Sequence, residues 1–528
     1  MYLLQFLNHI VEKILELGSE TRIKEAPPKK ANEALVTAIS NLTIQPAPLK
    51  SSYAEVRNQA MESKNALEDY LLLLRSEPIV LNQAVNAAYW SRAELVADDR
   101  GRILPAITDR HLSAALFEAM VTTVKMIATW DFILQLIQLL DGETDKVKRA
   151  LILQELSNTC HLEYRRAQES FKRNVAPQAH VASKRFKRIT DNATGQSKIS
   201  MKGQPADCTV SDPQLHHILR LCHPDTAPVA AVHWIQKLDD HNALYDEDRK
   251  RLSEAEMIAL GDIAIIVSFM HMTPTAMSMA PLSRKSGLLF TARSKELETE
   301  LDKVRAKADF GDYLVPLDNL LEPDMAARAL AALDDYVQKE TGARIGSLYE
   351  DIVQDSLQDL EEMYTKAKSR LEKENQKTTY VPLLTETPIT DDARLAARKE
   401  KQKTRPAGSS VYAITAPPET PAIVITEPPP TFKVKATTAV LFTTLFSKTQ
   451  ARASLSWVDF ESAMADLGFS ITPKGGSIYN FNPPASMDTR PITLHRPHVS
   501  EIEGYKMLIL ARRLQRVYGW TAETFAAV

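Results

Sequence analysis

The amino-acid sequence predicts a mainly α-helical protein, with a large all-helical N-terminal domain and a small C-terminal α+β domain. Apolar residues recur at three- and four-residue spacing from about residue 51 to residue 374, which is the period of an amphipathic helix. Strand-like alternation of apolar and polar residues gathers near the C-terminus, after a stretch rich in proline and threonine. These observations separate one helical part from one mixed part.

Composition and charge are ordinary for a globular protein. The 528 residues include 25% charged and 44% hydrophobic residues, with a formal net charge of −3. The overall charge therefore favours neither nucleic acid nor an anionic membrane. Three cysteines are too few for a disulfide framework and fit a reducing compartment. The N-terminus lacks signal-peptide features, and the most apolar run, 263–270, is too short to cross a bilayer. We expect no membrane contact and a cytoplasmic location, with the nucleus as the alternative.

Five parts follow one another along the chain. They are an N-terminal helix (1–20), a proline-bearing tether (21–50), the helical domain (51–374), a Pro/Thr-rich disordered linker (375–436) and the α+β domain (437–528). Within the helical domain, 116–140 is apolar enough to be a central core helix. The helix at 318–342 has a stop signal in Gly342.

The last helix of the helical domain carries a short heptad seam. Its apolar residues are Val353, Leu357, Leu360, Tyr364 and Leu371. The seam is shorter than an independent coiled coil needs, so packing on its own domain is the favoured interpretation. A homodimer that forms through these residues is the alternative.

Helix and strand signals alternate in the C-terminal domain. Ser456 stands three residues before Asp459, a spacing typical of a helix start, and the helix runs to about Gly468. Strands are predicted at about 469–472, 477–482 and 490–495, and a final helix at about 504–518. The order α-β-β-β-α predicts one sheet packed under two helices.

These elements, with "PKGGSIYNFNPP", "TLHRPH", "EIEG" and "YGW", resemble the HicA-type toxins over residues 457–528. Those toxins are small mRNA interferases with the architecture of a double-stranded-RNA-binding domain. The resemblance implies that fold, and RNA as the ligand. In the toxins a catalytic histidine directly follows the Gly-Ser pair. Here Ile478 follows Gly476 and Ser477, which argues for binding rather than cleavage.

A second resemblance covers most of the chain. The stretches "DDRGRILPAITDRHLS", "LQELSNTCHLEYRRAQ" and "TRPAGSSVYAIT" resemble filamentous-fungal proteins, some of which are labelled "ipa protein". This resemblance implies no particular activity.

Two histidines are the weak catalytic candidates. His495 and His498 can in principle move protons in RNA cleavage, because a histidine pKa lies near neutrality. The favoured interpretation is a polar strand end without a catalytic role. We therefore lean toward a protein that is not an enzyme.

Several cations are candidates for nucleic-acid binding. They are Lys474, Arg496, Lys506, Arg512, Arg513 and Arg516. The last three lie off the apolar stripe of the final helix, where they can meet phosphates together, although a solvated helix face is the simpler interpretation. Residues 437–528 hold nine basic and seven acidic residues, a net charge of +2, well below that of a strongly basic module.

Other chemical motifs are weak. Cys208, His216, His217, Cys222 and His223 are metal-ligand residue types, but their spacing matches no zinc pattern. We expect neither a metal nor a cofactor. The sequence predicts a helical scaffold with an RNA- or protein-recognition module at 437–528. Residual ribonuclease activity and assembly through residues 353–371 are the two alternatives.

Overall fold

The computed structural model describes most of the chain after residue 50. The described residues are 51–104, 109–177, 181–190, 197–377, 410–415, 431–447, 454–487, 489–497 and 500–527. The predicted helix at 1–20 and the tether at 21–50 lie outside the described residues. Residues 51–528 form one compact unit, so the two predicted domains belong to a single body.

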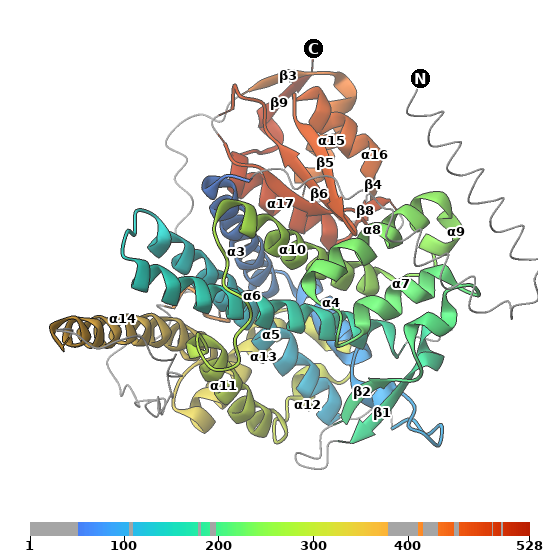
Figure 1. Ribbon diagram of the computed structural model, residues 1–528. Helices are drawn as coiled ribbons and strands as arrows, with labels where there is room; N and C mark the ends of the chain where they lie inside the picture. Colours follow the sequence, from blue (N-terminus) through green and yellow to red (C-terminus); the bar gives the residue numbers. More distant parts are fainter. Residues whose placement is uncertain are drawn as a thin grey trace, which may run out of the picture. The chain divides into compact units, whose positions relative to one another are not determined.

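The helical part is built from twelve α-helices among the described residues (Figure 1). They are α3 (Tyr53–Ser76), α4 (Pro78–Trp90), α5 (Asp109–Leu140), α6 (Lys146–Val175), α7 (Pro213–Cys222), α8 (Pro228–Leu244), α9 (Asp246–Arg249), α10 (Glu254–Ala276), α11 (Leu289–Arg305), α12 (Gly311–Leu314), α13 (Met325–Thr341) and α14 (Ile345–Lys377). The mainly α fold class is confirmed. Short-range signals set several helix ends: a capping box of Ser52 and Glu55 starts α3, and left-handed Gly342 ends α13.

Helices α5 and α10 lie at the centre of the helical core. By length and composition alone, both could cross a membrane, and 56% of the apolar window of each helix is buried inside the fold. Helix α5 packs on α3, α4, α6 and α14, and α10 packs on α3, α6 and α8. Their apolar character is what such a core position requires, because nearly every face of the helix meets another helix.

The helical part also contains a β-hairpin that the sequence analysis missed. Strands β1 (Phe186–Thr190) and β2 (Ser197–Met201) pair antiparallel, with Phe186 opposite Met201. Phe186 and Ile199 are buried, while polar or charged residues occupy most of the remaining positions. A strand pair of this kind has too few apolar positions to give a clear alternating pattern.

Helix α14 packs on its own chain. It contacts α5, α6 and α11. Of the predicted seam, Val353 and Leu360 are buried, Leu357 packs against the helical core, and the Tyr364 hydroxyl donates to Asp145 at 3.0 Å. Leu371 is 43% exposed. The described structure thus uses most of the seam inside the fold, and a homodimer through it stays a prediction.

The C-terminal module spans residues 431–527 and has its own core. Its elements are β3 (Phe432–Val434), α15 (Ala436–Phe446), β4 (Ser454–Ser456), α16 (Trp457–Asp466), β5 (Ser470–Gly475), β6 (Ile478–Asn482), β7 (Ile492–His495), β8 (Glu501–Glu503), α17 (Tyr505–Tyr518) and β9 (Phe525–Ala527). Strands β5, β6 and β7 form an antiparallel sheet in that order. Phe481 and Ile492 face each other across the sheet and pack under α16 and α17, with Trp457 and Leu514. The predicted α-β-β-β-α order is present, framed by further strands.

Part of the predicted linker is ordered. Residues 432–434 form β3, which pairs parallel with β9 at the end of the chain. Residues 410–415 lie against the helical part, where Tyr412 and Ile414 are buried. Composition predicted a linker because proline and threonine dominate this stretch, but two apolar side chains suffice to anchor a short segment in a prepared pocket.

Candidate recognition surface of the C-terminal module

The cations predicted to bind nucleic acid lie on elements that face the helical part. Helix α17 contacts α3, and strands β5 and β6 contact α8 and α10 (Figure 1). The module therefore meets three helices through residues that lie more than about 200 positions away in the sequence. We call the contacting residues of both sides the junction.

Helix α17 places three cations against carboxylates of the helical part. Arg513 pairs with Glu62, and Arg516 donates to Asp69 and Glu68, at 2.8 Å each. Lys506 pairs with Glu254 of α10 at 3.1 Å. Arginine suits such sites because its planar group reaches carboxylate oxygens with several donors. Arg513 and Arg516 lie one turn apart on α17 and face the acidic side chains of α3.

Glu62 is the centre of the junction. Its side chain is 5% exposed, and one carboxylate oxygen accepts from Arg513 and from the backbone N–H of Thr493 at 3.0 Å. Arg490 approaches the other oxygen at 3.6 Å. A buried carboxylate is costly unless cations and donors surround it, and the module supplies all three of these partners. Both hydrogen bonds that Glu62 accepts therefore come from the module, whereas its second oxygen accepts none.

Asp69 lies beside Glu62 on the same side of α3. Burial raises the pKa of Asp69 above its ordinary value, while the hydrogen bond from Arg516 works in the opposite direction. Arg516 therefore favours the charged form of this buried carboxyl group, against the effect of burial.

The glycine-rich turn between β5 and β6 fits into the helical part. Gly475 and Gly476 adopt left-handed φ values of 101° and 63°. A Cβ on Gly476 would lie 3.3 Å from the Cβ of Ala264 on α10. The Gly476 N–H donates to Asp239 of α8 at 2.6 Å, and the Ser477 hydroxyl donates to the Met257 carbonyl at 3.3 Å. The glycines serve both the turn and the close approach of the module to α8 and α10.

The carboxyl group of Asp239, which accepts the hydrogen bond from this turn, has an unusual pKa. Burial raises its pKa to about 7, although the hydrogen bond from Gly476 works in the opposite direction. The junction thus contains a carboxyl group that changes charge near neutral pH.

His495 lies on the sheet face that meets α10. The histidine ring fits only because residue 261 is a glycine: a Cβ there would lie 2.3 Å from its Cε1 atom. Burial, together with the nearby Arg513 cation, lowers the pKa of His495 to about 4. Its Nδ1 atom lies 3.4 Å from the Ser477 hydroxyl. His495 is neutral at neutral pH and packed against a helix, whereas His498 lies outside the described residues.

The remaining candidate cations have different environments. Arg496 donates to the Tyr479 hydroxyl at 3.3 Å and to the Ser500 hydroxyl at 3.0 Å, inside the module. Arg512 is partly buried, and Lys474 is exposed near the end of β5. The structure thus brings Lys506, Arg513 and Arg516 together at the junction.

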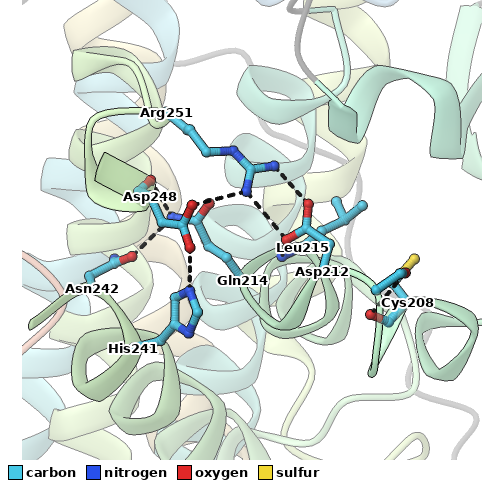
Figure 2. A network of polar contacts seen from close by, with 9 residues as sticks. Cys208, Asp212, Gln214, Leu215, His241, Asn242, Asp248 and Arg251 are labelled. Atoms are coloured by element: carbon cyan, nitrogen blue, oxygen red, sulfur yellow. Dashed lines mark hydrogen bonds and ion pairs between the residues drawn. The ribbon is translucent and has the colours of Figure 1, made fainter. Parts of the chain in front are cut away.

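A second polar network ties α7, α8 and α9 together (Figure 2). Asp212 accepts from the backbone N–H of Leu215 at 3.0 Å, which caps α7, and from Arg251 at 2.7 Å. Arg251 also reaches Asp248, whose second oxygen lies 2.8 Å from His241 Nε2. The hydrogen bond with His241 is the main cause of a lowered pKa at Asp248. These hydrogen bonds and ion pairs join α7, α8 and α9, so the evident role of the network is to hold these helices together.

The metal-ligand residue types of this region are used in packing. Cys208 and Cys222 are buried, and His216 Nδ1 lies 2.8 Å from the Pro205 carbonyl oxygen. Burial lowers the pKa of His217 to about 3. Among the described residues, no group of three or more such side chains is arranged to hold a metal ion.

Sequence reasoning missed the acidic half of the junction. Glu62 and Asp69 are seven residues apart, so they lie on one side of α3, and both are buried in the structure. They lie on the side of α3 opposite to the core residues Val56 and Ala60, so the helical periodicity of α3 gave no signal for their burial.

Comparisons with known protein families, with curated proteins and with solved structures found no match for this chain. The two resemblances described above therefore stay predictions.

Proposed function

We propose that this chain is a non-enzymatic scaffold whose C-terminal module is a protein-recognition module. Its basic face recognises an acidic surface on a helix. Within this chain, α3 provides such a surface. The observation that supports this function best is the pairing of Arg513 and Arg516 with Glu62, Glu68 and Asp69. Three of the six candidate cations, Lys506, Arg513 and Arg516, pair with carboxylates of the helical part.

Burial favours protein over RNA as the ligand of this face. Glu62 and Arg513 are both buried, and Ile478 of β6 belongs to the core of the helical part. An RNA strand can reach Arg513 only if this apolar and ionic contact opens first. Opening it also exposes to water the apolar side chains that the contact buries, such as Ile478. A phosphate backbone would have to repay that cost before it gained any affinity.

The ribonuclease alternative receives less support from the geometry. A catalytic histidine must reach the 2′-hydroxyl or the leaving oxygen of the substrate. The ring of His495 lies against Gly261, on the side of the sheet that α10 covers. A substrate would need the same opening of the junction.

The first experiment tests this proposal on the full chain. We would measure amide hydrogen exchange in β5–β7 and α17 for the wild type, for Arg516→Glu, and for Arg516→Glu combined with Asp69→Arg. Arg516→Glu should weaken protection in these elements by about tenfold, because it places three like charges together. The double variant, Arg516→Glu with Asp69→Arg, should recover most of that protection because the two charges are exchanged. Lys474→Glu is the matched control, because Lys474 is exposed on the same module.

RNA binding is measured on the same proteins, with labelled single- and double-stranded RNA over a range of salt concentrations. The proposal expects no salt-sensitive binding by the wild type or by the triple variant Glu62→Gln, Glu68→Gln, Asp69→Asn. RNA binding that appears in the triple variant and is lost with Arg513→Gln would overturn the proposal, because it would show that α17 is a phosphate-binding face.

A further inference from the structure

A short segment of the chain is bound to the helical part far from its neighbours in sequence. Between Lys377 and Thr431 the structure describes only residues 410–415. This segment, Ser-Val-Tyr-Ala-Ile-Thr, contacts α3, α5 and the start of α14 through single side chains and backbone atoms. No described helix or strand directly precedes or follows it in the sequence. Its own six residues therefore make the contacts that the structure describes.

Tyr412 fills a polar-ended pocket. Its side chain is 2% exposed, and its hydroxyl donates to Asp131 of α5. Asp131 also accepts from Gln135 at 2.9 Å and pairs with Lys64 of α3 at 2.8 Å. Burial raises the pKa of Tyr412 above its ordinary value, and the nearby Asp131 raises it further, so the hydroxyl stays a donor. The pocket is built to receive a phenol, with a fixed acceptor at its end.

The rest of the segment is held by its backbone and by one more side chain. Arg75 of α3 donates to the Ala413 carbonyl at 2.8 Å, and Ile414 is fully buried in the helical core. Gly346 of α14 lies directly under the segment, because a Cβ there would come within 2.7 Å of the Tyr412 carbonyl group. Val411, in contrast, is 65% exposed. Two anchors two residues apart, a backbone contact and an outward side chain are typical of peptide recognition.

We propose that the pocket formed by Asp131, Arg75 and Gly346 is a binding site for a short tyrosine peptide. Residues 410–415 are its ligand within this chain, and the same peptide supplied separately takes their place. The site recognises tyrosine followed by an aliphatic residue two positions later. This proposal is independent of what the C-terminal module binds.

The pocket selects tyrosine over phenylalanine. A phenylalanine ring can occupy the same space, but it leaves the buried Asp131 without one of its donors. The loss of one such hydrogen bond corresponds to about five- to thirtyfold weaker binding. Binding also requires a glycine at position 346. Any larger residue there obstructs the peptide backbone but leaves the tyrosine pocket itself intact.

The test uses a full-length host chain with Tyr412→Ala and Ile414→Ala, which empties the pocket. A fluorescently labelled peptide of residues 410–415 is titrated into this host and into the wild type, and binding is followed by anisotropy. We expect saturable binding to the host and at least about tenfold weaker binding to the wild type, where the attached segment competes at high effective concentration. Far-ultraviolet circular dichroism verifies that the host is folded.

Matched variants identify the site. A peptide with Tyr412→Phe should bind the host about five- to thirtyfold more weakly, whereas a peptide with Val411→Ala should bind as well as the original. Gly346→Ala or Asp131→Asn in the host should weaken binding of the original peptide. Equal binding to hosts with and without Gly346→Ala would place the peptide elsewhere and overturn the proposal.

A second host guards against misfolding of the first. The single change Tyr412→Phe keeps the ring and removes only the hydroxyl, so the attached segment becomes a weaker competitor. Peptide binding to this host should fall between that of the double variant and that of the wild type. If neither host binds the peptide, residues 410–415 are not a separable ligand and the proposal fails.

Discussion

Single residues at the junction are matched across hundreds of positions of sequence. Gly261 leaves room for the ring of His495, and Gly476 leaves room for Ala264. In both pairs one partner has no side chain because the other needs its volume. Such a fit, between the helical part and the module, is characteristic of the close packing found in protein interiors.

Asp239 makes stability depend on pH. Burial raises its pKa to about 7 from an ordinary 3.8, so the folded protein favours the protonated carboxyl group. The stability gained in this way is complete below about pH 4 and is lost as the pH rises toward 7. Asp239→Asn stays neutral, so its free energy of unfolding should gain about 1–3 kcal/mol relative to the wild type between pH 5 and pH 8. Urea denaturation at the two pH values measures this difference.

The neighbouring Asp240 is the control for this prediction. Asp240 is exposed and accepts from Gln236 on the same helix. Asp240→Asn should reduce the pH dependence only slightly, because the charge of Asp240 is a smaller cause of the raised pKa of Asp239 than burial is. If Asp239→Asn behaves like Asp240→Asn, then Asp239 does not titrate between the folded and unfolded states as we expect.

At the scale of elements, helix α11 begins with a cap from another helix. No side chain of its own N-terminal neighbour caps it. Glu155 of α6, which is fully buried, instead accepts from the backbone N–H groups of Leu289 at 3.2 Å and Phe290 at 2.8 Å. A negative charge at this end also suits the helix dipole. Burial raises the pKa of Glu155 to about 7, and the two N–H donors oppose that rise.

Glu155→Ala should destabilise the protein by about 2–4 kcal/mol, because it leaves two buried N–H groups without an acceptor. Glu155→Gln keeps an acceptor oxygen and should cost less. Thermal or urea denaturation compares these variants with Glu296→Ala, which changes an exposed acid on α11. Equal stability of Glu155→Ala and Glu296→Ala would show that α11 starts without this cap.

Helix α3 is the element that both proposals share. Glu68 accepts from Arg516 of the module and lies 3.7 Å from Lys64, which in turn pairs with Asp131 in the tyrosine pocket. One helix therefore carries the acidic surface for the module and one wall of the pocket. Its capping box and its apolar core residues fix it in place for both contacts.

At the scale of the whole molecule, two hydrophobic cores belong to one compact unit. The helical core includes Ile478 of the module, while the module core contains Trp457 and Phe481. Ion pairs and the glycine turn connect the two. Because Glu62 and its three partners lie in this connection, the coupled unfolding of the cores should depend on it.

Glu62→Ala should destabilise the protein by about 3–5 kcal/mol, because Arg513 is then buried without a counter-ion. We expect calorimetry to show one transition for the wild type and two for this variant, as the module separates from the helical part before the helical core melts. Glu340→Ala, an exposed acid on α13, is the control. A single transition at the wild-type temperature in Glu62→Ala would contradict the role of Glu62.

Local sequence patterns predicted most of the helices and strands, but few of the contacts between them. The stop at Gly342, the helix start at Ser456 with Asp459, and the three central strands of the module follow from short-range chemistry, and the structure has them close to the expected positions. The hairpin β1–β2 and the anchored segment at 410–415 were not predicted. Each depends on a few apolar side chains whose burial is decided by elements distant in sequence.

The sequence by itself determined the helical class, the position of the small mixed module and the basic side of α17, because periodicity and capping act over a few residues. Only the tertiary structure decided which residues that basic side contacts, why the β5–β6 turn has a glycine at position 476, and where Tyr412 binds. Those contacts join α17 to α3, the turn to α8 and α10, and the segment to α5. Pairings over such distances follow from the shape of the folded chain, which no local pattern records.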